Sequence, residues 1–295
     1  MKILLTGATG QVGWELARTL MPLGDVIAVD RSQADLADLT ALRAAIQQHK
    51  PDVIVNPAAY TAVDKAETET ALAYLINAEA PGVLAEEAAK TGALLVHYST
   101  DYVFDGTKAS PYTEADSTNP INVYGQSKLA GEQAIQSVAG DYLILRTSWV
   151  YASRGNNFLK TILRLAAERE ELKIVADQIG SPTWARLIAE TTAHVVRQAL
   201  RERQSGSFNS DVYHLTSSGE TSWHGFAQKI VELVREQGKL ELKNRKISPI
   251  PTSDYPLPAK RPANSRLSND SLEQQFGLVM PSWDNALRLC MQELG

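Results

Sequence analysis

Residues 2–13 read KILLTGATGQVG, an apolar run that leads straight into three glycines with the spacing Gly-x-x-Gly-x-x-Gly. The run predicts a buried β-strand, and the periodicity that follows predicts a helix. Glycines in such a turn let the backbone approach a pyrophosphate, while the helix N-terminus offers free N–H groups and a positive dipole end. We therefore expect a dinucleotide to bind here, in contact with Gly7, Gly10, Gln11, Val12 and Gly13.

The alternation of strand and helix continues through the first half of the chain. Strands are expected at residues 2–6, 25–29, 52–55, 93–99 and 142–145, and helices at 12–20, 39–49, 69–91 and 123–138. Strands that alternate with helices favour a parallel sheet covered on both faces. The expected fold is therefore α/β, a Rossmann-type doubly wound parallel sheet.

After about residue 151 the pattern changes. Helices are expected at residues 158–169, 184–201, 221–237, 270–275 and 283–293, a strand at 212–216, and a proline-rich loop at 250–262. This pattern predicts a smaller, loop-rich α/β lobe toward the C-terminus.

The composition of the chain argues against several classes of protein. Among 295 residues, 29 Lys and Arg face 34 Asp and Glu, a formal net charge of −5, whereas a nucleic-acid-binding protein needs a basic face. No apolar run approaches the ~20 residues of a membrane span, and the N-terminal residues turn glycine-rich too early for a signal peptide. The single cysteine, Cys290, excludes a disulfide framework within the chain and a cysteine-based zinc site. We expect a cytoplasmic globular protein without nucleic-acid or membrane partners.

The end of the second predicted strand bears on the choice of cofactor. Asp30 is an acid where NAD-binding sheets hold the ribose hydroxyls, whereas Arg31 has the guanidinium fork that matches the 2′-phosphate of NADP. The pair predicts mixed use of NADH and NADPH, with NADH ahead. Asp35 and Leu36 are expected beside the adenine, although a surface turn explains them nearly as well.

Tyr124 and Lys128 are four residues apart at the start of the helix expected after the fourth strand, so they share a helix face. An ammonium group near a phenol favours the phenolate and brings its pKa toward the working range. The pair is thus a candidate acid–base couple, and Lys128 is also placed to donate to the nicotinamide ribose. Thr100 ends the fourth strand, which we expect to neighbour the first strand, where doubly wound sheets bind ligands. There Thr100 would donate to a carbonyl oxygen also held by Tyr124.

With these motifs the chain resembles the extended short-chain dehydrogenase/reductase family. The glycine loop, residues 56–59 (NPAA), Ser99-Thr100 and the Tyr124/Lys128 pair carry that resemblance. Within it, nearly the whole chain is similar to the dTDP-4-dehydrorhamnose reductases. The matching blocks are residues 56–67 (NPAAYTAVDKAE), 97–106 (HYSTDYVFDG), 122–132 (NVYGQSKLAGE), 146–151 (RTSWVY), 155–158 (GNNF), 180–183 (GSPT) and 261–267 (RPANSRL).

The resemblance implies a reaction and roles for individual residues. A hydride from NADPH or NADH would reduce the C4 ketone of dTDP-4-dehydro-L-rhamnose to dTDP-L-rhamnose, which serves cell-surface polysaccharide. Tyr124 would donate the proton, Lys128 would tune it and Thr100 would polarise the ketone. The cofactor cleft would be lined by Ala59, Tyr60, Thr61 and Tyr98, and the sugar nucleotide would meet Thr100, Asp101, Trp149 and Arg261. Arg261 suits a diphosphate, and a structural salt bridge equally well.

The resemblance also implies a discontinuous division of the chain. Residues 1–154 plus roughly 183–216 would form the dinucleotide-binding domain, and residues 155–182 plus 217–295 the sugar-nucleotide lobe. Some members are dimers bridged by magnesium on glutamates, so a homodimer is one option here. Glu15 and Glu293 match two of those glutamates, but Arg186 stands at the third position. That cation makes magnesium doubtful, and a pairing of Arg186 with the two glutamates is the alternative.

Several other functions compete with the reductase. A nucleotide-sugar 4,6-dehydratase would need a second carboxylate after Asp101, where Tyr102 stands. An epimerase-reductase that makes GDP-fucose would need Cys and His near the sugar, and His97 is best read as a core or supporting residue. The resemblance extends to a non-catalytic, NADP-binding regulatory subunit of methionine adenosyltransferase. That alternative, and a reductase for another 4-keto nucleotide sugar, stay open.

Overall fold

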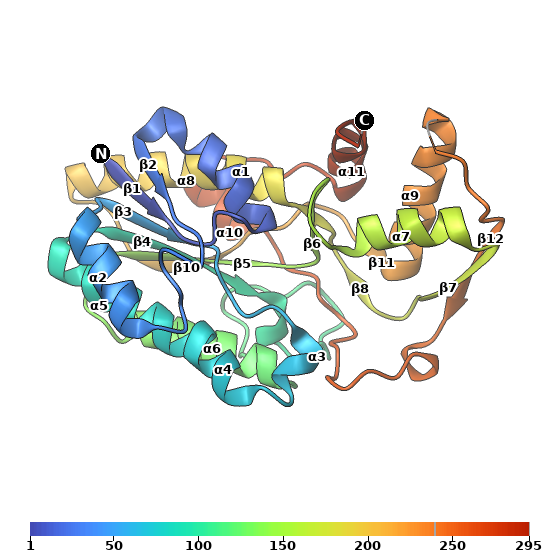
Figure 1. The fold of residues 1–295 in the computed structure, drawn as a ribbon, viewed down its shortest axis with the longest axis horizontal. Coiled ribbons are helices and arrows are strands. Elements are labelled where there is room, and N and C mark those ends of the chain that lie inside the picture. The colour runs from blue at the N-terminus through green and yellow to red at the C-terminus, as the bar shows by residue number, and fades with distance from the viewer. Residues whose placement is uncertain (239, 295) are drawn as a thin grey trace.

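The computed structural model describes residues 1–238 and 240–294. Its centre is a parallel sheet of six strands in the order β10-β5-β4-β3-β1-β2, seen nearly edge-on at the left of Figure 1. The strands are β1 (Lys2–Leu5), β2 (Asp25–Ala28), β3 (Val53–Asn56), β4 (Leu94–Thr100), β5 (Tyr142–Thr147) and β10 (Asp211–His214). β3 and β4 are buried along their whole length, as expected of strands covered on both faces.

Helices cover both faces of this sheet (Figure 1). On one face, α1 (Gln11–Thr19) and α8 (Ala185–Ser205) pack together over β1, β3 and β4 through residues such as Leu16, Val195 and Ile188. On the other face, α2 (Leu39–His49), α5 (Ala80–Thr91) and α6 (Val123–Gln136) contribute to a second cluster with Ile46 and Leu84. The expected Rossmann-type doubly wound sheet is confirmed.

Two details differ from the expectations. β4 lies between β3 and β5, so it does not neighbour β1, whose partners are β2 and β3. The reversal of strand order falls between β1 and β3, because the third strand of the chain already crosses to the far side of β1. The single helix expected at residues 69–91 is α4 (Thr70–Tyr74), a π-helical turn (Leu75–Glu79) and α5. α3 (Val63–Ala66) precedes it.

A smaller lobe lies at the right of Figure 1. It contains α7 (Phe158–Glu168), α9 (Trp223–Gln237), α11 (Trp283–Gln292) and a parallel pair, β7 (Glu171–Val175) with β12 (Lys246–Ile250). Phe226, Ile230 and Leu287 belong to its separate apolar cluster. Short strands join it to the sheet domain: β6 (Val150–Tyr151), β8 (Ile179–Gly180), β9 (Thr183–Trp184) and β11 (Thr221–Ser222).

The chain returns to the large sheet between the two parts of the lobe. α8 and β10 belong to the sheet domain, in line with the predicted return over residues 183–216. α10 (Asp270–Phe276), from the stretch expected in the lobe, also packs there, because Leu272 and Phe276 join the cluster of Val195. The loop predicted at 250–262 starts one residue later than expected, because Ile250 ends β12, and it contains a short 3-10 turn, Thr252–Asp254. The domain division as a whole stays a prediction.

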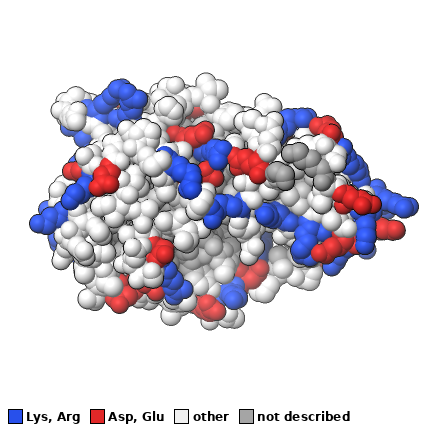
Figure 2. Space-filling model, turned by 45° about the horizontal axis from the view of Figure 1, so that its top comes forward, with Lys and Arg blue, Asp and Glu red and all other residues white. Residues whose placement is uncertain are grey.

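The charge on the surface and the hydropathy of the helices bear on whether the protein has nucleic-acid or membrane partners. On the face drawn in Figure 2, basic and acidic side chains are interspersed, and no continuous basic area is visible. Among the described residues, no helix combines the length and apolar character that crossing a bilayer requires.

Candidate active site

The glycine loop joins β1 to α1 in the geometry that its sequence predicts. Gly7 has φ +57°, and a Cβ there would lie 2.9 Å from the Cβ of Ala58, which follows β3. A Cβ on Gly13 would lie 2.1 Å from the Gly7 carbonyl oxygen, so the helix presses directly on the turn. Gly10 caps α1 with no side-chain hydrogen bond, and a Cβ there would meet only the Gly7 oxygen. The first N–H groups of α1 therefore have no side-chain cap, and Gly10 is exposed beside them, which fits a pyrophosphate.

The two parts of the molecule meet at this loop. Asn157, in the GNNF block, caps α7 and donates from Nδ2 to Gln11 Oε1 at 2.8 Å. Arg154 lies over the Trp14 ring at 3.3 Å from its centroid, and Arg18 lies over the same ring at 3.5 Å. Gln11 is thus tied to the lobe, so a dinucleotide on α1 would sit beside the joint between the domains.

The predicted adenosine-binding residues follow β2. Asp30 accepts from the backbone N–H and the hydroxyl of Ser32, which lowers the pKa of its carboxyl below the ordinary value. Arg31 is largely exposed and pairs with Asp35 at 3.0 Å. Leu36 is buried in the apolar cluster under the sheet. Asp30 and Arg31 are thus at the surface, where a ribose or its 2′-phosphate could reach them, whereas Leu36 serves the core.

β4 ends in the residues predicted to meet the substrate. Thr100 donates to Asp101 Oδ1 at 3.1 Å and accepts from the backbone N–H of Tyr102 at 3.2 Å. Asp101 is 2% exposed, and burial raises its pKa to about 7, opposed by hydrogen bonds from Ser265 and Thr100. The Tyr98 ring is part of the core over α8, and its hydroxyl is bonded to Thr192. Only the Tyr98 backbone faces the site, which differs from the predicted lining role of its side chain.

Helix α6 presents Tyr124 and Lys128. It starts after Asn122, whose Oδ1 accepts from the backbone N–H of Gly125, and the Asn122 amide donates to the Lys260 carbonyl. The Tyr124 ring meets the Tyr102 ring edge-on at 5.4 Å. Lys128 is 2% exposed and donates to the Tyr98 carbonyl oxygen at 2.6 Å. The helix therefore brings both side chains to the end of β4, as the i, i+4 spacing predicts.

The protonation states of these groups follow from burial. Burial raises the pKa of Tyr124 to about 12, while a hydrogen bond with Thr100 opposes the rise. Burial lowers the pKa of Lys128 to about 8, opposed by the charge of Glu132. The predicted lowering of the phenol pKa by Lys128 is therefore not seen here, and at neutral pH Tyr124 is a neutral phenol. Thr100, Asp101 and Tyr124 thus form one connected group, with Lys128 one helical turn away.

Asn77 is a residue that the sequence reasoning missed. It lies in the π-helical turn and is fully buried. Its Oδ1 accepts from the backbone N–H of Tyr60 at 2.8 Å, and its Nδ2 donates to the Tyr60 carbonyl and to Ser127 on α6. Asn77 thereby fixes the segment after β3 that holds Ala59, Tyr60 and Thr61. An asparagine in the middle of an otherwise helix-forming stretch was the available signal.

Trp149 and Arg261 are held by partners from the lobe and from α3. Trp149 has φ +48° and stacks on Trp223 with the ring centroids 3.6 Å apart. Arg261 donates to both carboxylate oxygens of Asp64 on α3, at 2.6 and 2.7 Å. Both terminal nitrogens of the Arg261 guanidinium thus donate to Asp64. This is the structural salt bridge that was one of the two roles predicted for Arg261. Its contact with a diphosphate stays a prediction.

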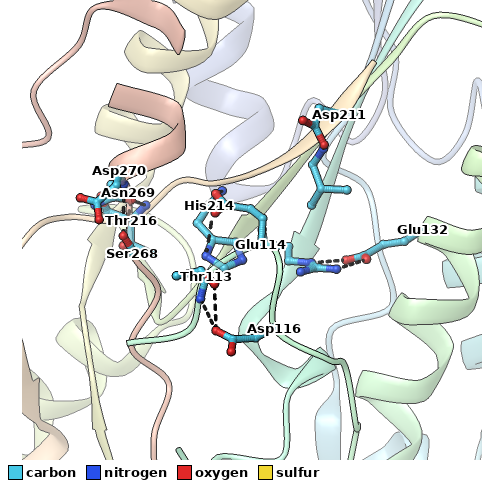
Figure 3. Close-up of polar contacts among 12 residues, drawn as sticks. Thr113, Glu114, Asp116, Glu132, Asp211, His214, Thr216, Ser268, Asn269 and Asp270 are labelled. Atoms are coloured by element: carbon cyan, nitrogen blue, oxygen red, sulfur yellow. Dashed lines mark hydrogen bonds and ion pairs between the residues drawn. The ribbon is translucent and has the colours of Figure 1, made fainter. Parts of the chain in front are cut away.

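An ion pair behind the site fixes α6 to the sheet. Arg146 on β5 donates to both carboxylate oxygens of Glu132 on α6, at 2.9 and 2.6 Å, and both side chains are almost fully buried (Figure 3). The same view shows Glu114 at the backbone of His214. The His214 imidazole lies edge-on to the Phe104 ring. Burial lowers the pKa of His214 to about 3, and the Arg146 charge adds to this. The Arg146–Glu132 pair ties α6 to β5.

The residues that match the family's magnesium ligands are paired with each other. Arg186, at the start of α8, is bonded to Glu15 on α1 at 3.1 Å and to Glu293 after α11. The predicted pairing of Arg186 with both glutamates is confirmed. A guanidinium between the two carboxylates does not fit a divalent cation. Within residues 1–238 and 240–294, no three His, Cys, Asp or Glu side chains are grouped to hold a metal.

Comparisons with known proteins decide the family. The family model described as RmlD substrate binding domain matches residues 1–295. A curated dTDP-4-dehydrorhamnose reductase of Burkholderia thailandensis is 58% identical over 295 residues, covering 100% of this chain and 99% of that protein. This chain belongs to the dTDP-4-dehydrorhamnose reductase family.

Solved structures of the reductase family have the same fold. A dTDP-4-dehydrorhamnose reductase from Clostridium acetobutylicum superposes with a TM-score of 0.90 at 39% identity, covering 100% of this chain and 99% of that one. A dTDP-4-dehydrorhamnose reductase from Bacillus anthracis, in complex with NADP, has a TM-score of 0.88 at 36% identity and covers 99% of each chain. The expected resemblance to the dTDP-4-dehydrorhamnose reductases is confirmed.

Proposed function

We propose that this protein is an NADPH- or NADH-dependent reductase that converts dTDP-4-dehydro-L-rhamnose to dTDP-L-rhamnose. The observation that carries the proposal is the meeting of Thr100, Tyr124 and Lys128 at the carboxyl end of β4, in a fold whose glycine loop fits a dinucleotide. The curated relative from Burkholderia thailandensis has this activity as its name. The residues of the site are assigned by their geometry and by their match to the family's motifs.

The site residues suit a reduction. When bound, the dinucleotide supplies a hydride to the carbonyl carbon C4 of the sugar. Tyr124 donates its hydroxyl proton to the carbonyl oxygen, which becomes the alcohol. Burial raises the pKa of the Tyr124 phenol to about 12, so Tyr124 is protonated at neutral pH and available as the proton donor. The Lys128 ammonium, one helical turn away, is placed to donate to the nicotinamide ribose. Thr100 directs its hydroxyl to the same oxygen once it is released from Asp101.

The adenosine end supports use of both cofactors. Asp30 is placed to accept from ribose hydroxyls, whereas Arg31 would bind a 2′-phosphate only by giving up its pairing with Asp35. The Arg31 side chain is 77% exposed, so breaking its ion pair with Asp35 costs little free energy. NADH is expected to be the better cofactor. The ratio of kcat/KM values for NADH and NADPH measures the preference, and Arg31→Ala should move it further toward NADH.

The decisive experiment compares the wild-type protein with Tyr124→Phe. Oxidation of NADH or NADPH is followed by absorbance with dTDP-4-dehydro-L-rhamnose. Loss of the proton donor should lower kcat on the order of 10²- to 10⁴-fold with little change in cofactor affinity. Tyr255→Phe, at an exposed tyrosine of the lobe, is the matched control and should behave as wild type. Near-normal turnover by the Tyr124 variant would remove the assigned role of this residue.

Three finer points also belong to the proposal. The base of the nucleotide is taken to be thymine, and a UDP-linked 4-keto sugar in the same assay tests this. The protein is placed in the cytoplasm, which the free, buried Cys290 supports. It is proposed to act as a homodimer, and light scattering of the purified protein checks the assembly. Wild-type protein that binds cofactor without turnover would favour the regulatory-subunit alternative.

A further inference from the structure

A continuous line of buried polar side chains crosses the sheet beneath the site. It starts at Thr6, after β1, whose hydroxyl lies 2.5 Å from Asn56 Oδ1 at the end of β3. Asn56 Nδ2 lies 3.0 Å from His97 Nδ1 on β4, and His97 Nε2 lies 3.1 Å from Lys128 Nζ on α6. All four side chains are at most 2% exposed. The reaction assigned above uses only the last of them.

The donors in this line determine which nitrogen of His97 carries the proton. An ammonium has three N–H donors and no acceptor, and Lys128 gives one of them to the Tyr98 carbonyl oxygen. His97 Nε2 must then be the acceptor of the second, so the imidazole is neutral with its hydrogen on Nδ1. The structure places Asn56 Nδ2 toward His97 and Asn56 Oδ1 toward the Thr6 hydroxyl. The amide turned by 180° has the same shape, and in that orientation its oxygen accepts from the His97 N–H and its amino group donates to the Thr6 oxygen.

The charges around the line agree with this arrangement. Burial lowers the pKa of His97 well below its ordinary value, and the nearby charge of Lys128 adds to the effect. Lys128 is faced along α6 by Glu132, which is itself paired with Arg146 from β5. The imidazole on β4 is therefore the neutral acceptor for a cation whose surroundings offer little other compensation. Without it, the ammonium would keep only the Tyr98 carbonyl among its β4 acceptors.

We propose that His97 is a positioning residue, which holds the Lys128 ammonium so that its third hydrogen is left for the dinucleotide, while Asn56 and Thr6 hold the tautomer of His97. The assignment rests on the proposed function, because Lys128 is given its role there. It explains why a histidine from β4, an asparagine from β3 and a threonine that follows β1 are buried in one line. An apolar residue at each position would cost less desolvation.

Three substitutions of His97 separate positioning from packing. His97→Gln places an amide oxygen near the position of Nε2 and keeps an acceptor for Lys128. His97→Asn reproduces the edge of the ring that faces Asn56 but stops short of Lys128, and His97→Leu removes both contacts. We expect kcat to fall on the order of 10- to 100-fold in the Asn and Leu variants, with little change in KM for the sugar. The Gln variant should stay within about threefold of wild type, as rescue of an orientation predicts.

The pH profile provides a readout that packing alone would not move. A hydrogen bond accepted from an ammonium favours its charged form, so removing the acceptor lets Lys128 lose its proton at lower pH. The alkaline limb of kcat should therefore move to lower pH in the Asn and Leu variants and stay in place in the Gln variant. Profiles that coincide in all four proteins would overturn the proposal, as would a Gln variant as impaired as Leu at equal thermal stability.

Binding measurements keep this test independent of turnover. The affinity for NADPH, measured by fluorescence from pH 6 to pH 10, also depends on the Lys128 charge. If wild-type protein shows no turnover, the proposed function fails, while the same order of variants in the pH dependence of binding still supports the role of His97. If the Leu variant does not fold, the comparison of Gln with Asn decides, because both carry an amide of the same kind.

Discussion

Asp101 is a carboxyl group whose burial has a consequence for stability. Its pKa is raised to about 7 in the folded protein, from an ordinary value near 3.8 in the unfolded chain. Between these values the folded state holds a proton that the unfolded state has lost, so the contribution of Asp101 to stability is lost as pH rises from about 4 to about 7. The full shift corresponds to up to about 4 kcal/mol.

Asp101→Asn removes this titration. Relative to wild type, the variant should gain between about 1 and 4 kcal/mol of unfolding free energy between pH 5 and pH 8, measured by urea titration at each pH. Asp105→Asn is the control of opposite sign, because hydrogen bonds from Thr107, Asn119 and Tyr112 lower the pKa of Asp105. That variant should lose stability relative to wild type as pH rises through the acid range. A difference between Asp101→Asn and wild type that stays constant with pH would contradict the raised pKa.

At the residue scale, the sequence predicts groups that act through spacing and misses those that act through long-range contact. Tyr124 and Lys128 share a face because four residues make one helical turn, so their meeting was predictable. The partner of Arg261 was not, since Asp64 is 197 positions away and only the folded chain brings them together. Asn77 lies in a π-helical turn, which leaves no periodic signal. The Tyr98 side chain points into the core because side chains alternate along β4.

At the element scale, the π-helical turn and α6 are in unusually close contact. Gly131 on α6 faces the Asn77 carbonyl oxygen, and a Cβ at this glycine would lie 2.0 Å from it. Gly131→Ala must therefore push α6 away from the turn, at a cost of roughly 1–3 kcal/mol. Because Tyr124 and Lys128 are on α6, kcat should fall as well. Thermal melting and the cofactor-oxidation assay measure the two effects.

Gly82→Ala is the matched control on the facing helix. A Cβ at Gly82, in α5, would meet only the Ala134 side chain at 3.4 Å, an ordinary contact. Alanine is the better helix former, so this variant should range from unchanged to about 1 kcal/mol more stable. Equal effects of the two substitutions would show that helix propensity, rather than the approach of α6 to Asn77, decides the outcome.

Most elements were predictable because each carries its own local pattern. Helix α2 spans the expected residues 39–49, and strand β5 starts where the apolar run starts. The pair β7–β12 was not predicted, since it joins residues 171–175 to 246–250, and β12 contains Pro249. The order of the strands was predicted only in part. The alternation of strands with helices predicts a doubly wound sheet. It does not predict which connection crosses β1, and that connection decides where β4 lies in the sheet.

At the scale of the whole molecule, Arg186 joins the two domains. Its partners are Glu15 on α1, which is 3% exposed, and Glu293 after α11, which also accepts from Ser153. A single guanidinium therefore pairs with two carboxylates that belong to different parts of the fold. Removing it should loosen α11 from the sheet domain and leave the acids facing each other.

Arg186→Glu converts this ion-pair triad into three carboxylates, the oxygen-rich arrangement that Mg²⁺ accepts. We expect the variant to lose thermal stability in EDTA and to recover part of it in millimolar magnesium, because the cation replaces the missing guanidinium. Arg186→Gln breaks the same pairs without adding a carboxylate, so it should lose roughly 1–3 kcal/mol with no recovery in magnesium. Wild-type protein should melt at the same temperature in EDTA and in magnesium, since its guanidinium occupies the place between the acids. Differential scanning fluorimetry of the three proteins under both conditions measures this. A wild-type melting temperature that falls when EDTA is added would mean that a metal, and not Arg186, holds the two domains together.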